Sequence, residues 1–338
     1  MLYSQKCIPT SHNSFASSSN KFIFWPNQQL SIKDQLEIGV RGFMLDLYTV
    51  GGVVVLRHGM ANMPGINKPI DGIDILLYDV FKEFTTFLDK KAHDKTCETI
   101  TIILESYVNN QETYRALNQT GLADIYLYKE NPNLATLEEV CNKIIIFTSH
   151  NKGVAKGIHP PSFYKENHYK YYKEGSNTLS ALDFEACEER AEGRAKYTNT
   201  SVNIFCFNHF SPLSALIDKA VLIKPLMHIG QETVDQALNA INIPYKFTTS
   251  SQDPVKALNI LLSLTKHIDN CRDKDIKDSF FPTIIAVDFI ERDSGVFLCC
   301  NDSRCLLGEE NSSIYDYFAG LAGRVTSWFY SNDTHAEL

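Results

Sequence analysis

The sequence lacks a long hydrophobic run, an excess of basic charge, and any internal repeat or low-complexity tract. No stretch approaches the ~20 consecutive apolar residues that a membrane-spanning helix requires. The net charge is −8. It argues against a nucleic-acid partner, because binding to phosphates requires clustered Lys and Arg.

The nine cysteines are an odd number and show no metal-ligand spacing. We expect most of them to be reduced thiols in the core, with one disulfide among the late cluster of Cys299, Cys300 and Cys305. Only ten residues precede the first motif, which is too short for a signal peptide. The expected location is therefore cytoplasmic, or outside the cell by a route that needs no signal.

The 338 residues, of which 44% are hydrophobic, can form one large barrel. Apolar strand-like runs alternate with helical patterns, and this alternation favours a parallel α/β sheet. A (β/α)8 TIM barrel takes ~250 residues and tolerates insertions. We predict one distorted barrel over residues 1–338, with an elaborated loop at 151–203. Two smaller expectations are a strand at 125–128 and a helix at 137–142.

Five apolar runs are each followed by polar or ionisable residues, as a barrel active site requires. The residues in question are His12 with Asn13, then Asp46, His58, Glu105 and Asp288. Because the active site of a TIM barrel lies at the carboxyl ends of its strands, these side chains should converge. Two histidines and several oxygen donors suit phosphodiester cleavage assisted by a metal ion.

The chemistry divides this set in two. Histidine can act as a base or an acid near neutral pH, so His12 and His58 are candidates for proton transfer. A carboxylate such as Asp288 beside His12 would fix its tautomer and favour its charged form. The oxygen atoms of Asn13, Asp46 and Glu105 suit Ca²⁺ or Mg²⁺ rather than a soft metal.

The motifs carry a family resemblance. SHNSF, QLEIGVRGFMLDLY, LRHG, IILESY and IIAVDF occur in this order between residues 11 and 292. They resemble the phosphatidylinositol-specific phospholipase C (PI-PLC) X-domain family, in particular its branch of phosphodiesterases with MLD in the second motif. That branch also tends to show an ERA segment, here Glu189 to Ala191, and an NHF strand, here Asn208 to Phe210.

The resemblance implies specific roles. His58 would protonate the leaving group, Asp288 would support His12, and the positions of Asn13, Asp46 and Glu105 would bind calcium rather than magnesium. Metal-independent bacterial members have an Arg where Asp46 stands, so Asp46 favours a metal. The departure is Met44, because calcium-dependent eukaryotic enzymes have a Glu at that position.

Two further residues are candidates for substrate binding. Asn208 lies on a strand and is expected to face the barrel interior. Arg41 precedes a strand, where it could contact phosphate or instead form a structural ion pair.

The predicted function is that of a phosphoric diester hydrolase of the phospholipase C type, acting on phosphatidylinositol or a related phospholipid as a monomer in peripheral contact with membranes. One alternative is a phospholipase D-like or glycerophosphodiesterase activity, although such enzymes use a Glu-x-Asp pair that Met44 breaks. The other is a catalytically weak barrel that binds phosphoinositides.

Overall fold

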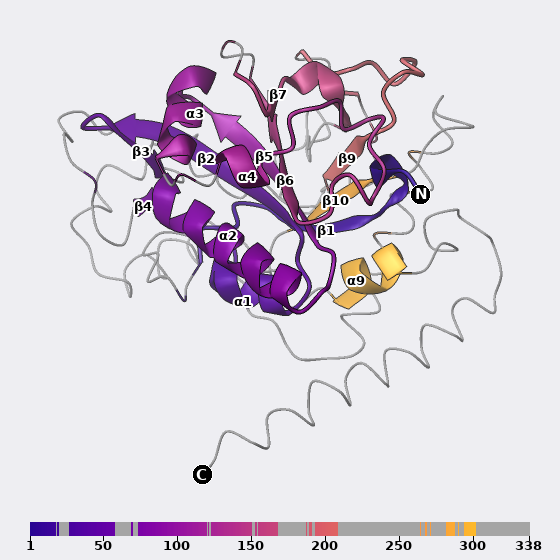
Figure 1. Ribbon diagram of the computed structural model, residues 1–338. Coiled ribbons are helices and arrows are strands. Elements are labelled where there is room, and N and C mark those ends of the chain that lie inside the picture. Colours follow the sequence, from indigo (N-terminus) through magenta and orange to yellow (C-terminus); the bar gives the residue numbers. More distant parts are fainter. Residues whose placement is uncertain are drawn as a thin grey trace, which may run out of the picture.

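The computed structural model describes the greater part of the first 208 residues and shorter segments after them (Figure 1). The described residues are 1–17, 19, 27–57, 69, 74–119, 121, 123–150, 153, 155–167, 187, 189–190, 193–208, 264, 268, 271, 282–287, 290 and 294–301. His58, Asp288 and residues 168–186 of the predicted loop at 151–203 lie outside this set.

Eight strands form a curled parallel sheet in the order β7-β6-β5-β2-β1-β10-β9-β8. Their bounds are β1 Ile8–Ser11, β2 Gly42–Val50, β5 Thr99–Ser106, β6 Lys143–Thr148, β7 Ile158–His159, β8 Lys165–Glu166, β9 Phe205–Asn208 and β10 Ile284–Val287. Within the described part of the chain, β7 and β8 do not pair with each other, so the barrel is open there. The predicted distorted TIM barrel of α/β class is confirmed.

A hairpin is added to this parallel path. β3 (Val53–Leu56) returns antiparallel to β2, and β4 (Ile75–Leu76) pairs with β3. In Figure 1 the β2–β3 hairpin projects beyond the rest of the sheet.

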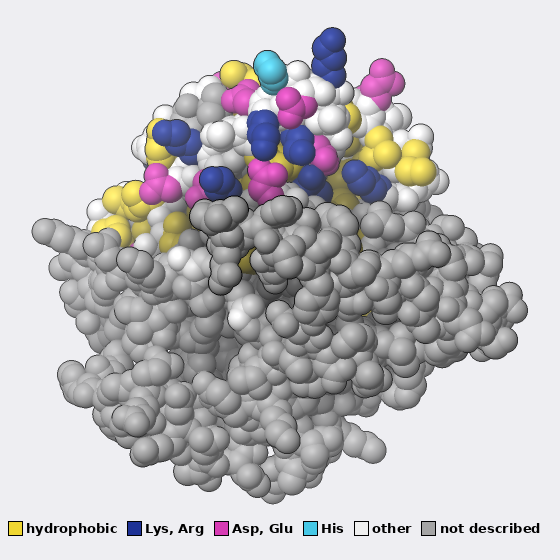
Figure 2. Space-filling model, turned by 90° about the horizontal axis from the view of Figure 1, so that it is seen from below, with side chains coloured by type: hydrophobic (Ala, Val, Ile, Leu, Met, Phe, Trp, Pro, Cys, Tyr) yellow, Lys and Arg dark blue, Asp and Glu magenta, His cyan; other side chains and the backbone are white. Residues whose placement is uncertain are grey.

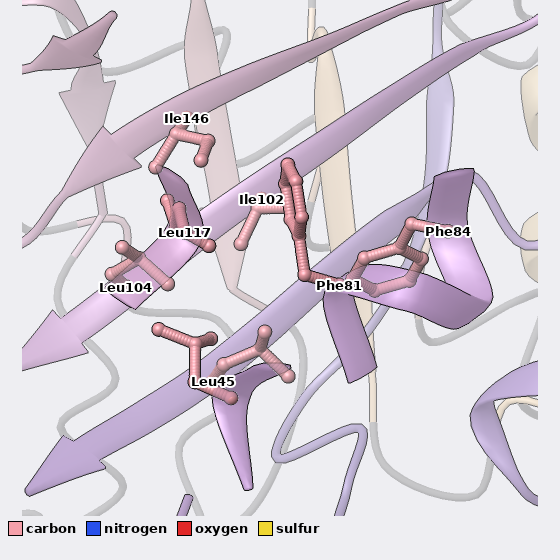
Figure 3. Close-up of a pocket in the computed structure, with 8 residues that line it drawn as sticks. Leu45, Phe81, Phe84, Ile102, Leu104, Leu117 and Ile146 are labelled. Atoms are coloured by element: carbon pink, nitrogen blue, oxygen red, sulfur yellow. The ribbon is translucent and has the colours of Figure 1, made fainter. Parts of the chain in front are cut away.

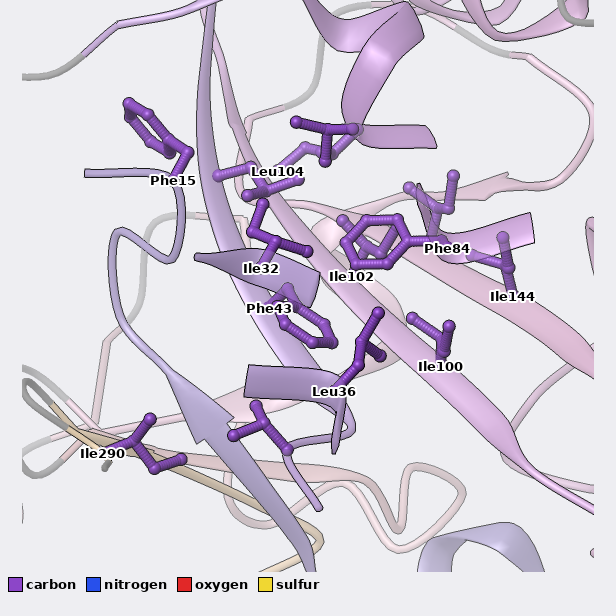
Figure 4. Close-up of a cluster of buried hydrophobic side chains, with 14 of the residues drawn as sticks. Phe15, Ile32, Leu36, Phe43, Phe84, Ile100, Ile102, Leu104, Ile144 and Ile290 are labelled. Atoms are coloured by element: carbon purple, nitrogen blue, oxygen red, sulfur yellow. The ribbon is translucent and has the colours of Figure 1, made fainter. Parts of the chain in front are cut away.

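Helices cover the outer face of the sheet. They are α1 (Ile32–Glu37), α2 (Leu77–His93), α3 (Asn110–Asn118), α4 (Ala123–Tyr126) and α9 (Ser294–Asn301), and short 3-10 turns occupy Tyr3–Gln5 and Pro161–Phe163. Ser31 caps α1 by accepting a hydrogen bond from the Asp34 backbone nitrogen, as its position predicts. Figure 4 shows α1 and α2 packing Leu36 and Phe84 against Phe43 and Ile102 of the sheet.

Side-chain alternation separates this outer core from the barrel interior. Along β2, Phe43, Leu45 and Leu47 belong to the outer cluster, while Met44 packs against the inner one. Because successive side chains of a strand point to opposite faces, Asp46 and Tyr48 face the interior with Met44. The Asp46 carboxyl group and the Tyr48 hydroxyl are thus directed into the barrel.

A narrow pocket lies between the helices and the outer face of the sheet (Figure 3). It is lined entirely by apolar side chains: Leu45, Leu77, Phe81, Phe84, Ile102, Leu104, Leu117 and Ile146. Since it opens on the face opposite to Asp46, we regard it as a gap in core packing.

Close approach of β1 and β2 depends on Gly42. A Cβ atom added at Gly42 would lie 1.8 Å from Oγ1 of Thr10 on the neighbouring strand. This contact is far too short for two atoms, so the absence of a side chain permits the pairing of Thr10 with Gly42.

Disulfide bonds correct one prediction. The structure pairs Cys7 with Cys300, Cys97 with Cys141 and Cys187 with Cys271, whereas Cys206 is a free buried thiol. The expectation of mostly reduced thiols was therefore wrong. Residues distant in sequence are brought to Cα separations of 4.8–5.1 Å, which disulfides require.

Two local predictions were also wrong. Residues 123–126 form the single helical turn α4, and Leu127 makes only an isolated bridge to Ile144. Residues 137–142 form turns that end at Asn142, whose φ of 54° is left-handed. Among the described residues, no helix is long and apolar enough to cross a membrane.

Candidate active site

The candidate site begins where β1 ends. His12 directly follows Ser11, and its backbone nitrogen donates a 2.8 Å hydrogen bond to the Val287 carbonyl of β10. This hydrogen bond extends the parallel β1–β10 ladder, which ends at the pair Ser11 and Val287, by one residue to His12. Asp288 comes next after Val287 in the sequence but lies outside the described residues, as does His58.

Two buried glutamines hold the segment after β1. Gln28 donates from Nε2 to the His12 carbonyl at 2.6 Å, and its Oε1 accepts from the Ile290 backbone nitrogen at 3.0 Å. Gln35 donates to the Ser14 carbonyl at 2.9 Å. The sequence analysis missed both residues, although Gln35 could have been found because it lies beside Ile32 and Leu36 on the apolar face of α1.

Asn13 adopts a left-handed backbone conformation with a φ of 44°, which Asn tolerates better than most residues. This turn lets the following residue join β2, because the Ser14 backbone nitrogen donates to the Met44 carbonyl at 3.0 Å. The Asn13 side chain is buried, and its Nδ2 donates to Asn27 at 3.4 Å. Asn13 therefore lies beside the strand that carries Asp46.

Asp46 and Glu105 lie directly opposite each other in the ladder of β2 and β5. Paired residues of neighbouring strands point to the same face, so both carboxyl groups enter the barrel interior. Burial, together with the negative charge of Glu105, raises the pKa of Asp46 well above its usual value. Two adjacent carboxylates of this kind are stabilised by a proton or a cation.

Aromatic rings surround the carboxylate pair. The Tyr107 hydroxyl donates a 2.6 Å hydrogen bond to Oε1 of Glu105. Its ring stacks on Tyr48 at a centroid separation of 4.6 Å and contacts the ring of His150 at 5.2 Å. The carboxylates therefore lie below an aromatic rim, of which Tyr107 is 48% exposed.

The donor set fits a hard divalent cation. Asp46 and Glu105 supply carboxylate oxygens that repel each other without a counter-charge, and Asn13, whose side chain contains an amide oxygen, follows the neighbouring strand β1. Met44 packs its side chain against the inner apolar cluster and contributes no oxygen. Within the described residues, no cluster of three or more His, Cys, Asp or Glu side chains forms a metal site.

Arg57 directly precedes His58 in the sequence. Its backbone nitrogen donates to the Asp46 carbonyl at 3.2 Å, so the chain leaving β3 passes beside the carboxylate pair. Its guanidinium forms two 2.6 Å hydrogen bonds with Asp74. This buried ion pair makes Arg57 a structural residue.

Arg41 lies at the other end of the barrel from Asp46. It precedes β2, and its guanidinium binds Glu98, which precedes the parallel strand β5, at 2.9 and 3.0 Å. Its Nη1 also donates to the carbonyl oxygens of Leu36 and Val40. The structure does not bring Arg41 to the candidate site, so we withdraw it as a substrate ligand in favour of the ion-pair alternative.

Asn208, the last residue of β9, is buried and enters a polar network. Its Nδ2 donates to Oε1 of Glu166 at 2.9 Å, and Glu166 also accepts hydrogen bonds from Arg190 and Arg194. Burial alone would raise the pKa of Glu166, but Arg190 and Arg194 together hold it below its usual value. Arg190 belongs to the ERA segment, which therefore supports the strand ends of β8 and β9.

Figure 2 shows one face of the molecule from below. In its described part, Lys and Arg side chains lie among Asp and Glu side chains. This part of the face thus carries charges of both signs.

Comparison with known proteins gives one curated relative and several solved structures. No protein-family model matches the chain. A PI-PLC X domain-containing protein of Arabidopsis thaliana is 23% identical over 222 residues, which cover 59% of this chain and 47% of that protein. The resemblance to the PI-PLC X-domain family is confirmed. The PI-PLC X-like chain thus spans about half the length of this relative.

Among solved structures, a phosphatidylinositol-specific phospholipase C of Staphylococcus aureus is 14% identical, with a TM-score of 0.44 over 85% of this chain and 86% of that one. A calcium-dependent phosphoinositol-specific phospholipase C of Pseudomonas is 12% identical, with a TM-score of 0.32 over 62% of this chain and 76% of that one.

Proposed function

We propose that this PI-PLC X-like chain is a phosphoric diester hydrolase of the phospholipase C type, acting on phosphatidylinositol or a related glycerophospholipid. The observation that supports the proposal is the strand order β1-β2-β5: His12 and Asn13 follow β1, which pairs with β2, and Asp46 of β2 pairs with Glu105 of β5. The ordered motifs and the similarity to the Arabidopsis protein support the same reading.

In this proposal His12 acts on the nucleophile. A substrate hydroxyl next to the phosphodiester attacks phosphorus, giving a cyclic phosphate and a released alcohol or diacylglycerol. His12 accepts the hydroxyl proton or stabilises the developing negative charge, and Asp288 supports His12. His58 donates a proton to the departing oxygen.

Asn13, Asp46 and Glu105 would hold a divalent cation, with Ca²⁺ preferred to Mg²⁺. When bound, the cation would neutralise charge on the phosphoryl oxygens. With Met44 in place of a fourth ligand, we expect weak affinity, with water and substrate completing the shell. Asn208 remains a proposed substrate contact on the inner face of β9.

The test compares His12→Ala with His93→Ala, a matched control because the His93 side chain is 90% exposed. Each variant is incubated with phosphatidylinositol vesicles and calcium, and products are followed by phosphorus NMR. Loss of general acid–base catalysis should slow His12→Ala by about 10²–10⁴-fold while His93→Ala keeps wild-type activity.

Product identity separates the alternatives. A cyclic phosphate supports the proposal, whereas free head-group alcohol with phosphatidate indicates the phospholipase D-like reaction. Vesicle binding without turnover in the presence of calcium would indicate a phosphoinositide-binding barrel instead.

A further inference from the structure

Tyr48 and Tyr107, which form the aromatic rim, point to the same face of the sheet as Asp46 and Glu105. Tyr48 follows Asp46 by two residues, and Tyr107 follows Glu105 by two, so all four side chains point into the barrel. Tyr48 and Tyr107 stack with an interplanar angle of 13°. The two phenols therefore form the next layer toward the barrel mouth.

Contacts other than the hydrogen bond to Glu105 fix the position of Tyr107. Its backbone nitrogen donates to the Leu47 carbonyl at 3.0 Å, which extends the β2–β5 ladder beyond β5. Tyr48 supports one side of its ring, and the His150 ring lies against it at 5.2 Å. A donor fixed in this way loses little conformational freedom when it binds a carboxylate.

The hydrogen bond to Glu105 has a directional consequence. The Tyr107 hydroxyl approaches Oε1 at 2.6 Å, a short contact typical of an O–H donor to a carboxylate. It limits rotation of the Glu105 carboxylate beside Asp46. A hydrogen bond that orients a metal ligand from outside commonly contributes a 10–100-fold factor in metal affinity.

We propose that Tyr107 is a positioning residue that orients Glu105 for a divalent cation shared with Asp46. The inference rests on the proposed cation site of the phospholipase C-type reaction. Tyr107 itself neither binds the cation nor moves a proton in the reaction, and its effect passes through the carboxylate.

The test measures Ca²⁺ binding to the purified full chain by calorimetry, with no lipid present. Tyr107→Phe keeps the ring and its stacking on Tyr48 but removes the hydroxyl. Tyr114→Phe is the matched control, because it removes a hydroxyl that donates to the surface carboxylate of Asp124 at 3.3 Å.

Tyr107→Phe should raise the Kd for Ca²⁺ by about 10-fold or more, while Tyr114→Phe leaves it unchanged and both variants melt like wild type in chelator. An unchanged Kd in Tyr107→Phe, or no Ca²⁺ binding by the wild type, overturns the inference. Phospholipid cleavage is assayed separately, so an inactive protein that still shows the tyrosine effect on Ca²⁺ would refute only the proposed reaction.

Discussion

The ion pair between Arg57 and Asp74 should be among the strongest single supports of the barrel. Its side chains are 2% and 0% exposed and share two 2.6 Å hydrogen bonds. Asp74→Asn removes the charge but keeps the shape, leaving the Arg57 guanidinium buried without its counter-ion. Breaking one partner of a buried pair costs about 3–5 kcal/mol. At about 2–4 °C per kcal/mol, Tm should fall by roughly 6–20 °C.

Two other ion pairs supply graded controls for a thermal melt followed by circular dichroism. The Arg41–Glu98 pair is 13% and 22% exposed, so Glu98→Gln should cost less than Asp74→Asn. The Lys90–Glu37 pair is 59% and 48% exposed, and Glu37→Gln should cost about 0–1 kcal/mol. Replacing both Arg57 and Asp74 by Met and Leu should recover most of the loss, because apolar residues need no counter-charge.

The experiment can refute the prediction that the more deeply buried ion pairs cost more stability when they are broken. If Asp74→Asn melts within about 2 °C of Glu37→Gln, the buried pair does not carry the stability assigned to it. If the Met and Leu double replacement is no more stable than Asp74→Asn, the loss comes from shape rather than from an unpaired charge.

Two further predictions concern charge and cross-links. The pKa of Asp46 is raised in the folded protein, so the folded state binds a proton more tightly than the unfolded state does. The resulting contribution to stability is fully present below the unfolded pKa near 3.8, and it is lost as pH rises through the raised pKa of the folded state. In chelator at pH 7, Asp46→Asn should therefore melt higher than wild type, and the difference should vanish at low pH; equal melting at both pH values would contradict this. Cys97→Ala with Cys141→Ala opens a loop with a sequence separation of 44, which should cost about 4 kcal/mol in a urea titration without reductant. Reductant should destabilise wild type by at least this much, because it also opens the other two disulfides. A double variant as stable as wild type without reductant would mean that this disulfide does not form.

The disulfides also bear on location. Three such bonds are typical of proteins that fold in an oxidising compartment, whereas cytosolic thiols are kept reduced. The compartment stays a prediction, with both options of the sequence analysis open.

The sequence was sufficient to predict the strands that carry Asp46 and Glu105, and with them the carboxylate pair. A long run of β-branched residues such as Thr99–Ser106 predicts a strand reliably. Parallel strands bring their carboxyl ends to one edge of the sheet, whatever the path of the chain that connects them. Hence Asp46 and Glu105 could be placed together before any coordinates were known.

Other features depend on contacts that a linear pattern does not contain. Cysteine spacing alone does not determine which thiols pair. The run at 125–128 is as apolar as a short strand, yet the buried Tyr126 bonds its hydroxyl to Asp89 on α2 and the segment forms a helical turn. Gln28 acts through backbone groups of residues far from it in sequence, so its own neighbours give no sign of this role.

The bond between Cys7 and Cys300 closes a covalent ring with a sequence separation of 293. One end of this ring immediately precedes β1, and the other belongs to α9. A protease that cut one peptide bond anywhere inside the ring would leave both fragments attached, so a nicked molecule would migrate as one species until a reductant was added. Damage to the intervening chain therefore need not release the first strand from the last helix described here.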